Sequence, residues 1–299
     1  MRKKTMKNIP VVTVYRKTLA EAYESAIINT FAQGTKFKTQ YDKPEDPPSL
    51  DCTLNLTIED PLRDPMIHKA FPGGFKDLRE YVYELQGLKD GWMKNMDDGK
   101  DTRWEYTYHF RFKHYGSWKE SNGIKGICDV DQIEYVINKL VEQPFTRQAQ
   151  MVTWIPKTDL TIYDPPCLQS CWYRILEDEE GVYWLNCNVR IRSNDAWGAS
   201  FMNMFGFIMF NQEVIANQIA ERTGKTVKLG RMNWQADSYH IYGKDIKDVN
   251  NRLMDRLNKT NFEDRVFNFY DEMVQEMYHE EEEKILANIK EMNEKYSNG

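Results

Sequence analysis

Apolar residues recur at helical spacing in several parts of the chain. Residues 18–34 contain Thr18 as a hydroxyl cap, Glu21 three positions later and Gly34 at the end, which is the pattern of a capped helix. Residues 75–87 show a similar amphipathic pattern ending at Gly87. Residues 129–144 show it most clearly, and Pro144 ends them. These segments predict amphipathic helices.

Alternation of apolar and polar residues predicts strands elsewhere. The predicted strands are residues 52–60, 148–155, 171–178, 182–193 and 226–243. The third and fourth flank the acidic turn EDEEG, so we expect them to pair. Residues 102–112 alternate aromatic and charged side chains, and this alternation predicts a half-exposed strand.

Two more segments are helical in pattern. Residues 200–224 are apolar over most of their length and end at Gly224, so we expect a long central helix. The tail from Phe262 onward is acidic and helical, and its run HEEEEK is typical of a solvated face. Strands and helices mix along the chain without strict alternation, which favours an α+β fold over a doubly wound sheet.

Composition narrows the class of protein. The chain has 299 residues, of which 41% are hydrophobic and 13% aromatic, with a formal net charge of −6. Such a chain can form a packed core and is not disordered. The acidity argues against general nucleic-acid binding. There is no apolar run of membrane-spanning length and no signal peptide in the N-terminal sequence, so we expect no membrane partner and a cytoplasmic location.

The five cysteines form no framework. Their number is odd and their spacing irregular, which disfavours disulfides. Cys167 and Cys171 are four residues apart, but no second Cys or His pair of zinc-like spacing accompanies them, so we predict no metal site.

Cys167 stands directly after Pro165 and Pro166. A buried, inert cysteine is one interpretation. A nucleophile held at one angle is the other, and it requires a nearby cation to stabilise the thiolate. Downstream, Arg192 and Ser193 offer a forked charge beside a hydroxyl, which suits a phosphate, although alternate arginines on an exposed strand give the same pattern.

Three more polar residues admit two interpretations each. Asn203 lies in an apolar helix, where an amide either makes local hydrogen bonds or reads the edge of a heterocycle with its adjacent donor and acceptor. His240 and Tyr242 alternate, so they point the same way from a strand. They are either interior aromatic residues or ligands of a sugar hydroxyl.

Taken in order, these residues resemble the thymidylate synthase family. The order is Pro-Cys at Cys167, Arg-Ser-x-Asp from Arg192 to Asp195, Asn203, and His-x-Tyr from His240 to Tyr242. The segments LREYVYELQG, YGSW and DQIEYVINKLVEQPFTRQ also resemble family segments, and the resemblance covers residues 50–245. It implies a two-layer α+β fold, a mixed β-sheet packed with helices, and a homodimer formed through the sheet.

The resemblance implies one-carbon transfer from 5,10-methylenetetrahydrofolate to carbon 5 of dUMP, giving dTMP for nucleotide biosynthesis. Cys167 matches the nucleophile that adds to carbon 6 of the base. Glu80 matches the glutamate that manages protons through water, and Tyr115 matches the tyrosine that assists proton removal. Asp195 matches the residue that contacts the folate ring.

Substrate binding follows by the same matching. Arg192 and Ser193 match the residues that hold the phosphate of dUMP, and Arg147 matches an arginine donated across the dimer interface, so that the two active sites are shared. Asn203 matches the reader of the pyrimidine, and Asn at this position implies uracil, whereas Asp implies cytosine. His240 and Tyr242 match the residues that bind the deoxyribose hydroxyl.

The chain also departs from the family pattern. Leu168 replaces the usual His after the cysteine, and Gln148 replaces the second cross-subunit arginine. The N-terminal phosphate arginine has no clear match, and Lys38 and Lys43 are the candidates to substitute for it. Five extra residues lie between Cys167 and the Arg-Ser pair. We expect a catalytic domain over residues 1–260 and an acidic helical extension over 261–299 in place of the short C-terminus that closes over the folate.

These departures keep two alternatives open. One is a dUMP hydroxymethylase of the same family, in which water captures the transferred carbon and the product is 5-hydroxymethyl-dUMP. The other is a homologue that binds nucleotide without turnover, because a fold does not guarantee a function.

Overall fold

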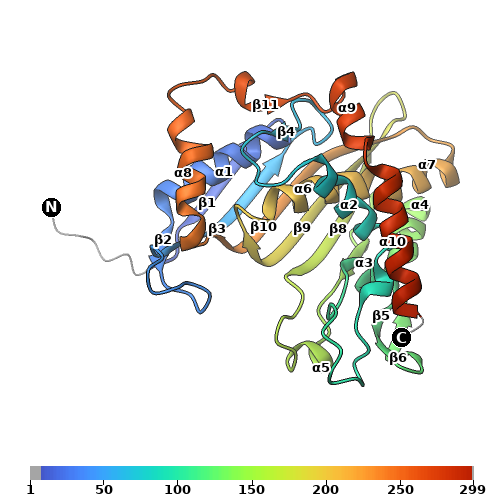
Figure 1. Ribbon diagram of the computed structural model, residues 1–299. Helices are drawn as coiled ribbons and strands as arrows, with labels where there is room; N and C mark the ends of the chain where they lie inside the picture. The colour runs from blue at the N-terminus through green and yellow to red at the C-terminus, as the bar shows by residue number, and fades with distance from the viewer. Residues whose placement is uncertain (1–7, 298–299) are drawn as a thin grey trace.

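The computed structural model describes residues 8–297, and its centre is one mixed β-sheet. Figure 1 shows β1, β3, β10, β9 and β8 side by side in that order. β1 is parallel to β3 and β9 to β10, whereas the other pairs are antiparallel. The strands are β1 Val11–Arg16, β2 Thr35–Phe37, β3 Ser49–Ile58, β7 Gln150–Val152, β8 Leu168–Glu177, β9 Tyr183–Asp195 and β10 Val227–Ile241.

One face of this sheet is apolar and buried. Leu56, Trp234, Val189 and Cys171 lie in register across β3, β10, β9 and β8, and each is at most 1% exposed. Helices α1, α4 and α7 contact the sheet. Side chains in a strand alternate between faces, so this row places the core on one side of the sheet.

The opposite face of the sheet is polar and accessible. Asn55, Gln235 and Arg190 lie in register across β3, β10 and β9, and their side chains are exposed or half-exposed. An antiparallel or mixed sheet with one such face meets either solvent or a second molecule there.

The helices confirm most of the predicted pattern. Thr18 caps α1 in a capping box and Gly34 follows its end, while the predicted long helix contains α6, a π-helical turn at Asn211–Ala216, and α7, which ends at Gly224 with φ +68°. The helices are α1 Leu19–Gln33, α2 Phe75–Leu85, α3 Tyr108–Lys113, α4 Gln132–Glu142, α5 Pro156–Asp159, α6 Ser200–Phe210, α7 Asn217–Thr223, α8 Ile246–Arg252, α9 Glu272–His279 and α10 Glu282–Ser297.

The predicted strand over residues 102–112 is wrong. Thr107 accepts a hydrogen bond from the backbone N–H of Phe110 at 3.0 Å and caps α3, so the second half of this segment is helical. A threonine that satisfies a free N–H at a helix start outweighs the alternation of aromatic residues. Two strands that were not predicted, β5 (Tyr115–Glu120) and β6 (Gly123–Val130), form a hairpin after α3.

The C-terminal segment packs against the core. Strand β11 (Val266–Phe267) pairs with β4 (Ile67–His68), and Figure 1 shows α10 beside α2. The prediction of a solvated face at HEEEEK is wrong for Glu282, which accepts a 2.6 Å bond from Arg79 of α2 and a further bond from the Tyr83 hydroxyl. A domain boundary at residue 260 stays a prediction.

Two negative findings apply to residues 8–297. No helix there is long and apolar enough to cross a membrane, and no three His, Cys, Asp or Glu side chains gather as they would around a metal ion. The five cysteine thiols are free. The basic start of the chain, on which the prediction of a missing signal peptide rests, lies largely outside the described residues.

Candidate active site

A cavity of about 980 Å³ lies at the edge of the sheet where β9 and β10 end. These strands run parallel, with Ser193 beside Ser238 and Asp195 beside His240, so both deliver polar side chains to the same edge. Parts of α2 and α6 and residues from segments 103–108 and 163–167 complete the wall. The sequence-predicted residues that line it are Cys167, Arg192, Ser193, Asp195, Asn203, His240 and Tyr242.

The peptide before Cys167 is held by Arg192. The guanidinium donates from Nε to the Pro166 carbonyl at 3.1 Å and from Nη2 to the Pro165 carbonyl at 2.5 Å, and the Arg192 backbone N–H donates to the Cys167 carbonyl at 2.7 Å. Proline has a fixed φ and no N–H, so the turn presents only acceptors. The arginine supplies the matching donors.

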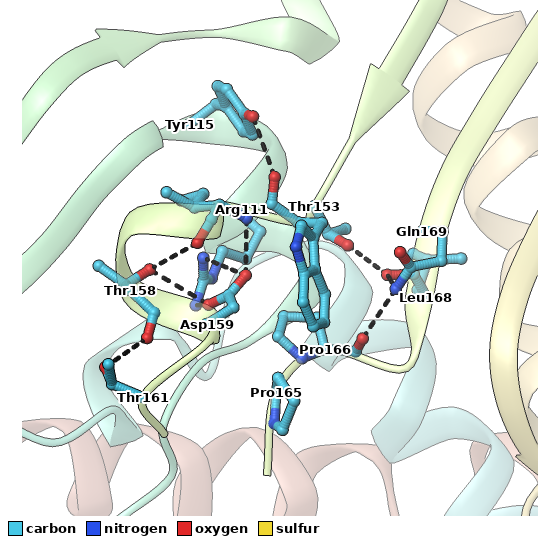
Figure 2. Close-up of polar contacts among 12 residues, drawn as sticks. Arg111, Tyr115, Thr153, Thr158, Asp159, Thr161, Pro165, Pro166, Leu168 and Gln169 are labelled. Carbon is cyan, nitrogen blue, oxygen red and sulfur yellow. Dashed lines mark hydrogen bonds and ion pairs between the residues drawn. The ribbon is translucent and has the colours of Figure 1, made fainter. Parts of the chain in front are cut away.

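The segment before Cys167 is held by hydrogen bonds and a buried ion pair, several of which Figure 2 shows. Arg111 donates to Asp159 at 2.7 Å in a pair that is almost fully buried, and the Asp159 carboxylate also accepts the Ile155 N–H at 2.6 Å. At the far end, Gln169 donates to the Pro166 carbonyl at 3.0 Å. These contacts limit how far the cysteine can move.

The environment of Cys167 acts on the pKa of its thiol in two opposing ways. Burial raises the pKa of Cys167 above its usual value, Arg192 opposes this rise, and Asp164 adds to it. The sulfur lies on the cavity wall and is half-buried. Its position and its arginine neighbour suit a nucleophile that is ionised when substrate binds.

Asn203 is half-buried and takes part in a chain of polar groups whose other members are buried. Its Oδ1 accepts from Asn194 Nδ2 at 3.2 Å, and its Nδ2 donates to the Tyr81 hydroxyl at 2.9 Å. Asn194 Oδ1 in turn accepts from the Trp234 indole N–H at 3.0 Å. The amide of Asn203 therefore has a defined orientation, with one lone pair and one N–H left over.

Asp195 and His240 present unused polar atoms. Asp195 Oδ1 accepts from the backbone N–H groups of Trp197 at 3.1 Å and Gly198 at 2.9 Å, which leaves Oδ2 without a partner among residues 8–297. His240 Nδ1 lies 3.2 Å from Ser238 Oγ, but its buried Nε2 has no partner in the described part of the chain. Burial lowers the pKa of His240, while the Asp195 and Asp51 charges oppose this, so the ring is neutral near pH 7.

Three predicted site residues lie outside this cavity. Glu80 forms an ion pair with the buried Lys89 at 2.9 Å. The Tyr115 hydroxyl donates to the Trp154 carbonyl at 3.0 Å, as Figure 2 shows. Arg147 is exposed at the edge of the sheet, where its carbonyl accepts from Trp172. Lys38 and Lys43 do not line the cavity, and Lys38 donates to carbonyls of its own loop.

The sequence interpretation missed residues that do line the cavity. Glu84 is one turn after Glu80 on the same helix, and Lys89 Nζ lies 3.7 Å from it. Burial raises the pKa of Glu84 to about 7, Lys89 opposes the rise, and the charge of Glu80 adds to it. The i, i+4 spacing of the two glutamates was the signal available in the sequence.

Tyr106 and Tyr108 were missed for another reason. Both line the cavity, and their pKa values are raised, mainly by burial and also by charges nearby that include Cys167. They lie in the segment that was expected to be a strand, where alternation gave no reason to single out a tyrosine.

Comparisons with known proteins identify the family to which this chain belongs. The thymidylate synthase family model matches residues 81–284, more than half of the chain. The chain belongs to the thymidylate synthase family. A relative from Methanosarcina mazei is 31% identical over 198 residues, which cover 66% of this chain and 76% of the relative. One from Methanocaldococcus jannaschii is 27% identical over 240 residues, which cover 78% of this chain and 91% of the relative. Both bear the name "Putative thymidylate synthase".

The family match agrees with the observed architecture. A mixed sheet packed with helices is the α+β fold expected of this family. The match runs on to residue 284 and includes α9, whose Tyr278 is buried in the main core. The cavity-lining residues from Tyr81 to Tyr242 all fall within it.

Proposed function

We propose that this protein transfers a one-carbon unit from 5,10-methylenetetrahydrofolate to carbon 5 of dUMP and releases dTMP. The observation that carries the proposal is the meeting of Cys167, the Arg192–Ser193 pair and Asn203 on one cavity. A nucleophile, a phosphate ligand and a reader of the pyrimidine edge are the groups that this reaction requires.

Cys167 is the proposed nucleophile. Its sulfur bonds to carbon 6 of the uracil, the thiol proton leaves to a base in the cavity, and the ring electrons move toward carbon 5 and the oxygen on carbon 4. Arg192 favours the thiolate because its positive charge lies nearby. Asn203 Nδ2 has an N–H left over that suits the oxygen on which negative charge develops.

Glu84 is the proposed proton carrier, in place of the expected Glu80. It lines the cavity, and a carboxyl with a pKa of about 7 both gives and takes a proton near neutral pH. Tyr106, which also lines the cavity, takes the place expected for Tyr115. Glu80 then acts on Lys89, the cation that both glutamates share.

Arg192 and Ser193 bind the phosphate of dUMP in this proposal. His240 Nε2, which is buried without a partner among residues 8–297, and Tyr242 bind the deoxyribose hydroxyl. An unpaired buried ring nitrogen on a cavity wall is costly unless a ligand satisfies it.

The residues present fit the folate. Oδ2 of Asp195 is an acceptor without a partner among the described residues, and the aromatic Trp104 lies on the cavity wall, 41% exposed. An acceptor and an aromatic wall suit a reduced pterin ring with its N–H donors. When bound, this group would supply both the carbon that is transferred and the hydride that reduces it to a methyl group, and it would leave as dihydrofolate.

A homodimer formed through the polar face of the sheet completes the proposal. Asn55, Gln235 and Arg190 provide a polar surface, and Arg147 is exposed three residues before the edge strand β7. A symmetric pairing of two such faces would let Arg147 reach the phosphate of the partner's cavity.

One observation favours the hydroxymethylase alternative. No described residue after Tyr242 lines the cavity, and α10 lies against α2 instead. Because α10 does not cover the site, there is room for a water molecule beside the transferred carbon, and exclusion of water is what separates the two outcomes.

The test is incubation of the purified protein with dUMP and methylenetetrahydrofolate, with Cys167→Ser as the control. Release of dTMP and dihydrofolate supports the proposal. Release of 5-hydroxymethyl-dUMP and tetrahydrofolate supports the hydroxymethylase. Binding of 5-fluoro-dUMP without a folate-dependent adduct at Cys167 would leave only a nucleotide-binding protein.

A further inference from the structure

Four side chains from four parts of the chain form a continuous line of hydrogen bonds that ends at the cavity. Trp234 Nε1 donates to Asn194 Oδ1 at 3.0 Å, and Asn194 Nδ2 donates to Asn203 Oδ1 at 3.2 Å. Asn203 Nδ2 then donates to the Tyr81 hydroxyl at 2.9 Å. Every bond runs in the same direction, from the tryptophan toward the tyrosine.

Only one member of this line has a fixed polarity. A carboxamide both donates and accepts, and a phenol hydroxyl does the same, so Asn194, Asn203 and Tyr81 could each take part in the reversed line. The indole N–H only donates. Trp234 therefore obliges Asn194 to offer its oxygen, which turns the Asn194 amino group toward Asn203 and the Asn203 oxygen toward Asn194.

The direction of the line decides what a base meets in the cavity. Uracil offers an N–H at position 3 beside an oxygen at position 4, whereas cytosine offers a bare nitrogen beside an amino group. An amide that points its oxygen at ring position 3 and its N–H at the group on position 4 complements uracil. A half-turn of the amide exchanges its oxygen and nitrogen, and it then complements cytosine. An Asn203 amide held in one orientation can therefore complement only one of the two bases.

We propose that Trp234, acting through Asn194, is the positioning residue that fixes the Asn203 amide and thereby the preference of this protein for uracil over cytosine. The inference rests on the proposed function, in which Asn203 reads the base. The restraint acts between distant parts of the sequence, because Trp234 is on β10 and Asn203 is on α6.

Burial makes the restraint effective. Trp234 is fully buried and Asn194 is 2% exposed, so solvent does not readily replace a lost partner. If Asn194 turned over, its amino group would face the indole N–H, and two donors would be left unsatisfied. That penalty corresponds to a preference of about tenfold or more for the observed orientation.

The test compares dissociation constants for dUMP and dCMP by calorimetry, in the wild type and in Trp234→Phe. We expect the dCMP-to-dUMP ratio to fall by about tenfold or more in Trp234→Phe, because either amide orientation is then allowed. Trp197→Phe is the matched control. It removes another buried indole N–H, which donates to Asp248 at 2.8 Å and does not line the cavity, and its ratio should not change.

Two further variants separate the ends of the line. Asn194→Leu keeps a side chain of similar size but removes the hydrogen bonds to Trp234 and Asn203, so it should lower the ratio as Trp234→Phe does. Tyr81→Phe removes the far end and should keep the ratio within about twofold, because Trp234 still sets the direction. Thermal unfolding of each variant verifies that it is folded.

The outcomes are distinct. If the wild type shows no preference for dUMP, the proposed reading of the base by Asn203 fails. If the wild type prefers dUMP but folded Trp234→Phe and Asn194→Leu keep the wild-type ratio, the role of Trp234 is overturned and the proposed function stands. If the preference for dUMP is lost in Tyr81→Phe and in no other variant, Tyr81 rather than Trp234 fixes the Asn203 amide, and the inference is overturned.

Discussion

The Nε atom of Arg192 lies 3.1 Å from the carbonyl oxygen of Pro166, the residue directly before Cys167. The proposed phosphate ligand and the proposed nucleophile thus share one hydrogen-bonded unit. The two prolines make this possible, because they leave the turn with acceptors that a forked guanidinium can satisfy.

Replacement of Arg192 by lysine should disturb both functions of this unit. A lysine carries the charge but cannot donate to both proline carbonyls in the geometry of the guanidinium. We expect Arg192→Lys to lower kcat/KM for dUMP by about a hundredfold, with a rise in KM and a fall in kcat. Steady-state kinetics measure this. A change confined to KM would show that Arg192 serves the phosphate alone.

The reactivity of Cys167 should depend on pH in a particular way. Burial raises the pKa of its thiol, so alkylation by iodoacetamide should be slow at neutral pH and should still increase at about pH 9. Arg192→Gln should slow it further, because the charge that favours the thiolate is lost. Cys128→Ser removes the exposed thiol from the background. A rate that levels off below about pH 7 would contradict the raised pKa.

Glu84 should make stability depend on pH. Its folded-state pKa is about 7 and the usual carboxyl value is 4.5, so between these values the folded protein holds a proton that the unfolded chain has lost. The contribution of Glu84 to stability therefore falls as pH rises through this window. The unfolding free energy of Glu84→Gln minus that of the wild type should therefore increase by about 2 kcal/mol from about pH 5 to about pH 8.

Chemical denaturation at the two pH values measures the change, and Glu177→Gln is the control. Glu177 does not line the cavity, and its pair with Lys225 is exposed. Glu84→Gln should also remove most of the turnover, because glutamine cannot carry a proton. Full activity in this variant would exclude Glu84 as the proton carrier.

Breaking the buried ion pair of Arg111 and Asp159, which holds the segment before Cys167, should lower the stability of the fold. Asp159 is 2% exposed and Arg111 6%, so Asp159→Asn leaves a buried guanidinium without its counter-charge. We expect the free energy of unfolding to fall by about 3 kcal/mol. The exposed pair of Arg222 and Glu134 provides the comparison, and Glu134→Gln should cost less than about 1 kcal/mol. Equal losses would show that burial is not the cause.

Long periodic segments were predictable from the sequence. The strands of the sheet alternate because one face is buried, and the capping box at Thr18 and Glu21 marked α1. The cavity residues from β9 and β10 were also found, because they lie on regular strands whose ends are adjacent. Local spacing is informative where the backbone is regular.

The missed residues depend on irregular or long-range features. A motif comparison placed Tyr115 in the site, but the capped helix α3 comes just before it and the tyrosine turns toward Trp154. Glu84 lines the cavity and Glu80 does not, a difference of one helical turn. The contact between Trp234 and Asn194 joins adjacent strands and has no sequence pattern at all.

The polar face of the sheet has a consequence for how the protein is assayed. If two copies pair through it, Arg147 of each copy contributes to the cavity of the other. Dilution then dissociates the dimer and removes this positive charge from the cavity, while Cys167 itself is unchanged. Turnover per chain would then depend on enzyme concentration. Low activity in a dilute preparation would reflect dissociation of the dimer rather than a defective nucleophile.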